Sequence, residues 1–352
     1  MKIQFNDIFV DCTSDGTKIP KESYLKSGKY IIIDQGQNQI AGFTNQEDGV
    51  YSDVPAIIFG DHTRVIKYVD EPFFLGADGV KLLKSTKKDV NYKYLYYALL
   101  SLKVLNLGYN RHFKLLKESN IEYCNINTQN SIVKILDKIN SIIQKHKKEI
   151  NHLDTLIKAR FVEMFGDPVL NNYQWEVKKL KDLSVLITNG TTPDGGDKNY
   201  TNNGIMFLRS QNIWKNRMEL DEVVYISEEM NNKMKKSQVQ HNDILITKTG
   251  RINTENSSLG RAALFEGKNN SANINGHVYL VRLNKSVLPK FVLTILIGDE
   301  YREYIRKVCV GGIDKRQINI EQVENFPIIL PDIRMQEKFC DFVYHIDKLK
   351  VA

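Results

Sequence analysis

The sequence lacks long apolar runs and closely spaced cysteines, and each absence excludes a class of protein. No uninterrupted run of about 18 apolar residues occurs, so a membrane-spanning helix is not expected. The N-terminal segment carries acidic residues where a secretory signal peptide requires an apolar stretch. The four cysteines lie far apart without CxxC spacing, which argues against a zinc site or a disulfide framework. We therefore expect a protein of the reducing cytoplasm, without membrane partners.

The chain also lacks a strong excess of one charge. Its net charge is +7 at pH 7 over 352 residues, which permits a polyanionic partner but does not require one. With 42% apolar and 26% charged residues, the composition is that of a globular protein. The length is sufficient for two domains, each with its own core.

Sequence motifs of catalysis are missing as well. There is no NPPY or NPPF run to hold a target adenine, no phosphate-binding GxxxxGKS or GxxxxGKT loop, and no HExxH or nucleophile-elbow motif. Asp194, Asp197 and Lys198 loosely suggest a metal nuclease, but their PDGGDK context is typical of a turn. We therefore expect no catalytic residues, no metal site and no cofactor in this chain.

The sequence does contain an internal repeat. A series of Gly-Thr, Pro, Tyr-x-x-x-Gly and a strand begins at Gly16 and returns from Gly190 onward. Later members keep their order in both copies, as short apolar runs typical of buried strands and longer runs typical of helices. The paired segments are 29–33 with 205–208, 56–60 with 243–247, 78–83 with 275–280, 92–102 with 289–298, and 121–126 with 323–328. We predict an α+β fold of two similar mixed α/β domains.

A long helix is predicted after the first copy. Its apolar residues recur at alternating spacings of about four and three, which is a heptad-type seam. The seam consists of Ile132, Leu136, Ile139, Ile143, His146, Ile150, Leu153, Ile157 and Met164. At about 1.5 Å per residue, these roughly 33 residues span about 50 Å. Such a stripe must pack against another helix, and the predicted partner begins at Gln336, with Phe339, Val343, Ile346 and Leu349 in the same register.

A short junction between this helix and the second copy carries a family resemblance. The helix ends in FGDP (165–168), and Trp175 follows. Together with the repeat, the GTTP loop, the DILITKTG strand (243–250), the 272–278 stretch and the LP…Q entry to the last helix, this resembles the specificity subunits of Type I restriction-modification systems. The resemblance covers essentially the whole chain. Departures are Asn127-Thr128, where the family usually has proline, and a last helix that stops at Ala352, well short of its counterpart.

The resemblance implies a domain organisation. It comprises target-recognition domain 1 (1–126), a spacer helix called conserved region 1 (127–165), target-recognition domain 2 (166–330) and the start of a truncated second spacer helix (331–352). In the family, the two helices pair antiparallel as in a coiled coil, and a pseudo-twofold arrangement presents one recognition domain at each end. The implied partners are double-stranded DNA, two methylation subunits and restriction/translocase subunits. S-adenosylmethionine, ATP and Mg are expected only on those partner subunits.

Candidate DNA contacts are polar residues in loops that follow predicted strands. Lys and Arg suit phosphates, whereas Arg, Asn and Gln suit base edges. In the first copy the candidates are Gln35, Gln37, Asn38, His62, Arg64, Asn110, Arg111 and Lys114, with Tyr109 beside them. In the second copy they are Arg209, Ser210, Gln211, Asn212, Lys248, Thr249, Arg251, Arg261, Lys315 and Arg316. Because the two sets differ, we expect a bipartite, asymmetric target. Any single candidate could instead be a solvated charge or a capping residue.

Two other interpretations stay open from the sequence. The long helix could organise a protein assembly without DNA reading. Alternatively, the short last helix could belong to an inactive specificity protein. Salt-sensitive DNA binding that survives for only one sequence would separate these interpretations from the first.

Overall fold

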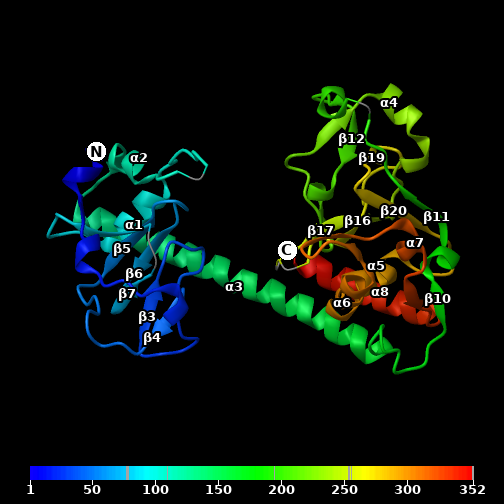
Figure 1. Cartoon of the computed structure of the whole chain (residues 1–352), viewed down its shortest axis with the longest axis horizontal. Helices are drawn as coiled ribbons and strands as arrows, with labels where there is room; N and C mark the ends of the chain where they lie inside the picture. The colour runs from blue at the N-terminus through cyan, green and yellow to red at the C-terminus, as the bar shows by residue number, and fades with distance from the viewer. Residues whose placement is uncertain (77–78, 109, 194, 253, 255, 351–352) are drawn as a thin grey trace. The chain divides into compact units, whose positions relative to one another are not determined.

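The computed structural model describes residues 1–76, 79–108, 110–193, 195–252, 254 and 256–350 (Figure 1). Asp78, Tyr109, Asp194 and Ala352, which were named from the sequence, lie outside these ranges. The chain divides into two compact units, Met1–His146 and Lys147–Ala352, here called unit 1 and unit 2. Within the described ranges, none of the helices combines the length and the apolar character that crossing a membrane requires.

Unit 1 is built around a four-stranded antiparallel sheet in the order β2-β8-β5-β6. Beside it lie a three-stranded sheet, β4-β3-β7, and the pair β1-β9. The strands are β1 (Lys2–Gln4), β2 (Phe9–Asp11), β3 (Tyr30–Ile33), β4 (Gly42–Thr44), β5 (Ala56–Gly60), β6 (Ile66–Val69), β7 (Phe73–Leu75), β8 (Val80–Ser85) and β9 (Asn120–Glu122). The helices are α1 (Tyr92–Leu100), α2 (Phe113–Lys117) and the first part of α3 (Ile126–Phe165).

Unit 2 has a corresponding set of sheets, β11-β20-β16-β18, β15-β12-β19 and β10-β23, and two further ones, β13-β14 and β17-β22-β21. The strands are β10 (Val177–Lys179), β11 (Ser184–Asn189), β12 (Ile205–Leu208), β13 (Ile213–Trp214), β14 (Arg217–Met218), β15 (Val224–Ile226), β16 (Ile244–Thr247), β17 (Thr249–Arg251), β18 (Ala262–Leu264), β19 (Ala272–Ile274), β20 (Val278–Leu283), β21 (Val310–Gly311), β22 (Lys315–Gln317) and β23 (Pro327–Ile329). The helices are the rest of α3, α4 (Glu228–Lys233), α5 (Pro289–Ile297), α6 (Asp299–Val308), α7 (Ile320–Glu324) and α8 (Ile333–Leu349).

The internal repeat predicted from the sequence is confirmed strand by strand. In unit 1, β3 pairs antiparallel with β4 and parallel with β7. In unit 2, β12 pairs antiparallel with β15 and parallel with β19. The four-stranded sheets also match, with β5 and β16 each lying between two antiparallel neighbours. The fold is therefore α+β with two similar units.

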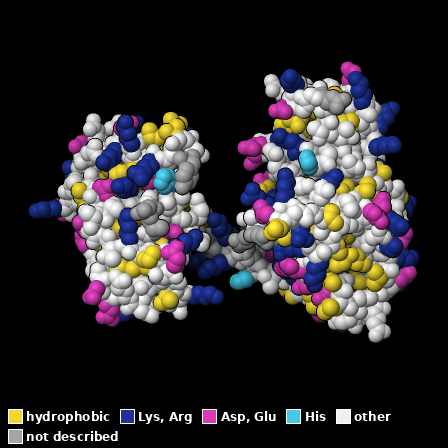
Figure 2. Space-filling view, in the orientation of Figure 1, with side chains coloured by type: hydrophobic (Ala, Val, Ile, Leu, Met, Phe, Trp, Pro, Cys, Tyr) yellow, Lys and Arg dark blue, Asp and Glu magenta, His cyan; other side chains and the backbone are white. Residues whose placement is uncertain are grey.

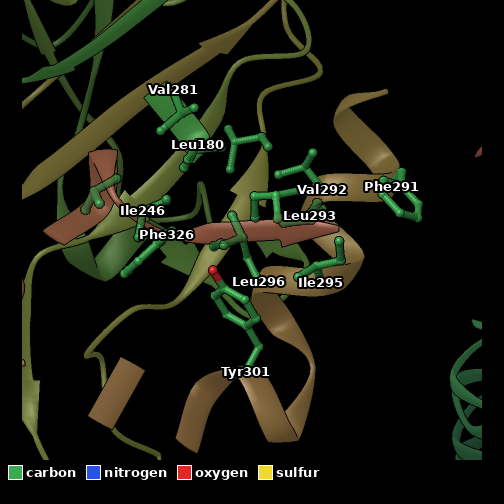
Figure 3. Packing of buried hydrophobic residues seen from close by; sticks show 14 of the residues in the cluster. Leu180, Ile246, Val281, Phe291, Val292, Leu293, Ile295, Leu296, Tyr301 and Phe326 are labelled. Carbon is green, nitrogen blue, oxygen red and sulfur yellow. The ribbon is translucent and has the colours of Figure 1, made fainter. Parts of the chain in front are cut away.

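Apolar runs in the sequence became the strands and helices of the cores. Every residue of β5 and of β16 is buried, as expected for uninterrupted apolar strands covered on both faces. Helix α5 begins with Pro289 at its first position, where a missing N–H costs nothing. Figure 3 shows side chains of α5 gathering with Leu180, Ile246 and Phe326 in the core of unit 2.

The last helix packs against the end of the long helix. Within unit 2, the rings of Phe161 and Phe165 in α3 lie 5.4 and 5.6 Å from the ring of Phe339 in α8. Further along, Lys350 Nζ lies 2.7 Å from Asp154 Oδ1. Phe339, Val343 and Ile346 are buried as the seam predicts, whereas Leu349 is 62% exposed. Every residue from 138 to 152 is exposed, so the seam is uncovered in the middle of α3 and covered toward its two ends.

Candidate nucleic-acid interface

In unit 2, two segments that were singled out separately from the sequence lie in one small sheet. Strand β17, which follows β16 after a single residue, pairs with β22 so that Gly250 is opposite Arg316 and Arg251 is opposite Lys315. The backbone N–H of Ile318 also donates to the carbonyl of Lys248 at 2.9 Å. Lys248, Thr249 and Arg251 are thus neighbours of Lys315 and Arg316, although more than 60 residues separate them in the chain.

The charged side chains of this sheet are available at the surface. Arg251 and Lys315 are exposed, and Arg316 is half-buried. The Nε of Arg251 lies 3.3 Å from Asp314 Oδ2, and the Nε of Arg316 donates to the Gly312 carbonyl at 3.2 Å. Lys248 Nζ lies 5.8 Å from the centre of the Tyr279 ring. These contacts orient the cations but leave donors free to meet an anion.

The loop that follows β12 lies near the same place. Asn275 N–H donates to the carbonyl of Leu208, the last residue of β12, at 3.0 Å. Lys248 N–H donates to the carbonyl of His277 at 2.9 Å. The turn 275–277 therefore joins the end of β12 to the end of β16. We call the surface formed by the ends of these two strands and by β22 the unit 2 junction.

Within the loop 209–212, the four candidates differ in their surroundings. Asn212 is buried, accepts from the Arg209 N–H at 2.9 Å and donates to the Glu219 carbonyl at 2.9 Å. Arg209 lies 5.7 Å from the centre of the Tyr200 ring and donates to the Glu222 carbonyl. Ser210 is half-buried, and Gln211 is exposed. Asn212 shapes the loop, whereas Gln211 has its amide at the surface.

Arg261 is engaged inside the protein. Only 9% of it is exposed, and its guanidinium carbon lies 3.9 Å from the centre of the Trp214 ring. It donates to the carbonyl of Ser257 at 3.1 Å and to that of Asn256. Burial, helped by the nearby Arg217, lowers the pKa of the Arg261 guanidinium. Among the candidates in unit 2, the side chains of Arg209, Asn212 and Arg261 are each engaged within the protein in this conformation.

Unit 1 contains the equivalent junction, built from different residues. Gly76 N–H donates to the carbonyl of Ile33 at the end of β3, and Asp61 N–H, just after β5, donates to the Gly79 carbonyl. His62 N–H donates to Gln35 Oε1 at 3.2 Å, and Thr63 Oγ1 donates to the Gln35 carbonyl at 2.6 Å. The loops that carry Gln35 and His62 are thus in direct contact.

The third segment of the unit 1 junction is held by a buried Asp–His cluster. Asp61 accepts from Phe113 N–H at 2.8 Å through Oδ1, and its carbonyl accepts from His112 N–H. Leu107 N–H donates to His112 Nε2 at 3.2 Å, so the ring proton lies on Nδ1, which donates to the Asp61 carbonyl at 3.0 Å. This cluster keeps exposed Asn110, Arg111 and Lys114 beside the end of β5, with Arg111 Nε 4.0 Å from Asp61 Oδ2.

A buried lysine fixes the loop after β3. Lys67 is 2% exposed, and its Nζ donates to the carbonyl of Asn38 at 2.6 Å and to Asp34 Oδ1 at 3.3 Å. Burial lowers the pKa of this amine, against the opposing effect of Asp34. Gln37 and Asn38 are exposed on the loop that Lys67 holds. Arg64 adopts a left-handed backbone with φ 60°, and its side chain donates to the Val104 carbonyl at 3.1 Å.

Several residues that build the junctions were not found from the sequence. Lys67 and Asp61 support the candidates, but each is a single charged residue with no motif around it. Figure 2 shows Lys and Arg side chains on the visible face of each unit with Asp and Glu among them, which agrees with the modest net charge.

The comparison with protein families decides the class of the chain. The family described as Type I restriction modification DNA specificity domain matches residues 2–154 and 172–352. The chain belongs to this family. The resemblance stated from the sequence is thereby confirmed, and the two matched segments follow the two copies of the repeat.

Two curated relatives and one solved structure agree with the family. The chain is 22% identical over 335 residues to the Type I restriction enzyme EcoR124I/EcoR124II specificity subunit of Escherichia coli, covering 90% of this chain and 79% of that protein. It is 24% identical over 176 residues to the protein named as the MjaX type I restriction enzyme specificity subunit of Methanocaldococcus jannaschii, covering 50% of this chain but only 40% of that protein. The crystal structure of a Type-I restriction-modification system S subunit from M. genitalium superposes with a TM-score of 0.57 at 16% identity, over 99% of this chain and 90% of that one. This last likeness shows a shared fold.

Proposed function

We propose that the chain is the non-catalytic DNA-recognition subunit of a Type I restriction-modification complex and reads a bipartite, asymmetric target. The observation that carries the proposal is the equivalent construction of the two junctions. In each junction, the ends of two corresponding strands lie beside a segment from further along the chain, residues 110–114 in unit 1 and β22 in unit 2. The exposed side chains nevertheless differ between the units. Two units with the same backbone architecture but different exposed side chains suit two half-sites of different sequence.

The division of labour within each junction follows from chemistry. Arg111 and Lys114 in unit 1, and Arg251 and Lys315 in unit 2, are exposed cations suited to phosphates. Gln37, Asn38 and Gln211 carry exposed amides, which pair with adenine edges in the major groove. Asn212 and Arg261 position their loops rather than contact bases. Methylation and cleavage are then supplied by partner subunits, which carry S-adenosylmethionine, ATP and Mg, in the cytoplasm.

Methylation mapping tests the proposal. The chain is co-expressed with its methylation subunit, and adenine methylation is mapped across a plasmid by single-molecule sequencing. We expect methylation at one split motif whose two halves differ. A stable complex that methylates no site, or that methylates a symmetric motif, would contradict the proposal.

A single substitution then assigns one junction to one half-site. Gln211→Ala removes an exposed amide without touching the core, and we expect relaxed methylation in one half of the motif only, since one bidentate pair contributes about 1–3 kcal/mol of discrimination. Lys285→Ala is the control, because this exposed residue follows β20 at the end opposite the junction. Changes in both halves, or the same change in the control, would argue against the assignment.

A further inference from the structure

Each junction carries a large apolar side chain at its exposed edge. In unit 2, Ile313 is 89% exposed at the tip of the hairpin formed by β21 and β22. In unit 1, Leu105 is 70% exposed and Leu107 is 49% exposed in the segment that returns to the junction after α1. A single exposed apolar residue is common on protein surfaces. Here such residues occur in both copies, in the segment that follows α1 or α5 and precedes α2 or α7.

The backbone next to these apolar residues is held by hydrogen bonds and, in unit 2, also by an ion pair. Ile313 lies between Gly312, whose carbonyl accepts from Arg316 Nε at 3.2 Å, and Asp314, which pairs with Arg251 at 3.3 Å. Leu105 follows Val104, whose carbonyl accepts from Arg64 at 3.1 Å. One arginine in each unit, Arg64 or Arg251, comes from the segment after the equivalent strand, β5 or β16. The apolar side chains are therefore held outward by the loop and not merely left on a free end.

The neighbours of the apolar residues are cationic. Lys315 and Arg316 follow Ile313 in β22, and Arg251 is opposite Lys315. In unit 1, Lys103 precedes Leu105, and Arg111 and Lys114 follow in the same returning segment. A protein partner that covers apolar surface usually meets a contiguous apolar patch. The exposed apolar residues here are few, Ile313 and Val310 in the unit 2 hairpin and Leu105 and Leu107 in unit 1, and basic residues lie close to them in the sequence. Such an arrangement suits a groove, because the cations meet phosphates while an apolar group reaches past them.

We propose that Ile313 and Leu105 insert into the DNA groove of their half-sites and pack against bases, while the adjacent Lys and Arg residues hold the phosphates on either side. This inference rests on the proposed function and adds a contact that carries specificity without hydrogen bonds. Apolar side chains discriminate bases through thymine methyl groups and through base steps that open easily. The two residues thus contribute sequence preference, and the cations contribute affinity that depends on salt.

Fluorescence-anisotropy titrations test this inference. The complex of the chain with its methylation subunit is titrated with a duplex that contains the mapped motif and with a scrambled duplex, at several salt concentrations. For Ile313→Ser we expect about tenfold weaker binding to the motif, with binding to the scrambled duplex unchanged. The dependence of log K on log salt keeps its slope, because no phosphate contact is lost. Leu105→Ser behaves likewise for the other half-site.

Two matched variants give the reference behaviour. Lys315→Ala weakens binding to both duplexes and reduces the salt slope by about 0.9, as expected for one phosphate contact. Val185→Ser replaces another apolar residue that is 65% exposed, on β11, and leaves binding unchanged. Thermal unfolding of each variant complex is measured alongside, and an unchanged transition separates loss of contact from loss of fold.

The other outcomes each overturn the inference. Motif binding by Ile313→Ser and Leu105→Ser equal to that of the wild type would refute insertion but leave the proposed function intact. Loss of the methylation subunit during purification of the Ile313→Ser variant would show that the tip of the β21–β22 hairpin contacts that subunit instead of DNA. A wild-type complex that does not distinguish the two duplexes would refute both the proposed function and the insertion.

Discussion

Buried charges in both units are held by hydrogen bonds to specific partners. In unit 2, Asp243 is 1% exposed and receives two bonds from Arg282, at 2.9 and 2.7 Å. The same arginine donates to the Gln238 carbonyl, so the pair fixes the segment that leads into β16. In unit 1, Lys67 fixes the loop after β3 through Asp34 and Asn38. Lys67 thus does structural work beside the unit 1 junction, whereas the Asp243–Arg282 pair does so at the end of β16 opposite the unit 2 junction.

Removing one partner of the Asp243–Arg282 pair is expected to be costly. Arg282→Leu leaves the Asp243 carboxylate buried without its counter-charge, which typically costs about 3–5 kcal/mol. We expect a loss of about 3 kcal/mol in the free energy of unfolding, measured by urea titration. Lys233→Leu, which breaks the exposed pair with Glu229, serves as the control and should change stability little. Equally small changes in the free energy of unfolding for both variants would show that the buried pair contributes no more to stability than the exposed pair.

Several of these residues could not be predicted from the sequence. Strand β6 reads Ile-Lys-Tyr-Val, and alternation would place Ile66 and Tyr68 inside. The structure buries Lys67 and Val69 instead, because the lysine finds an acceptor in the neighbouring loop. Exposed candidates such as Gln211 could be named from strand-following position, but buried Arg261 follows the same rule and packs on Trp214. Position after a strand predicts proximity to the junction, and not the direction of a side chain.

At the level of elements, uninterrupted patterns were predicted and small irregular pieces were not. Strands β5, β12 and β16 and helices α1, α5 and α3 were predicted within a few residues of their observed bounds. Helix α6 was missed although it is a regular amphipathic helix of 10 residues. The sheet β17-β22-β21 was missed because its strands have only two or three residues and their pairing joins distant segments. Contacts of that kind depend on the assembled fold and leave no periodic signal.

Asp299 links three elements through exposed charges. It begins α6 and lies 2.7 Å from Lys158 in α3 and 2.9 Å from Lys215 between β13 and β14. Hydrogen bonds from Lys158 and then Lys215 lower the pKa of Asp299 to about 2. Because the folded pKa lies below that of an unfolded aspartate, near 4, the carboxylate stabilises the fold above about pH 4 and loses this effect as the pH falls toward 2.

Asp299→Asn tests this linkage. We expect a small decrease in the thermal unfolding temperature at pH 7, because the charges are largely exposed and screened by solvent. The difference from the wild type should stay constant down to about pH 4 and shrink below it, followed by calorimetry in low-salt buffer. A difference that does not depend on pH would show that the asparagine acts through packing and not through charge.

For the whole molecule, the two copies of the repeat share their sheet topology and differ in the segments between the strands. The two four-stranded sheets and the two mixed three-stranded sheets have the same topology, while α4, α6 and the extra hairpins occur in unit 2. Residues 1–126, predicted as one recognition domain, can then be replaced as a block by the corresponding domain of another specificity subunit. We expect the mapped methylation motif of such a chimera to change in one half and to keep the other. A change in both halves would mean that the two units do not read independently.

The middle of α3 has a consequence for how the chain opens in solution. Residues 138–152 bury no side chain, so their helical hydrogen bonds are supported only by the continuity of α3 with the packed turns before and after them. A helical segment of about 15 residues is marginal in water without tertiary contacts. Its amide hydrogens should therefore exchange with solvent far faster than those of β5 or β16, long before either core unfolds. Any partner that lies along this stretch would be visible as protection of those same amides.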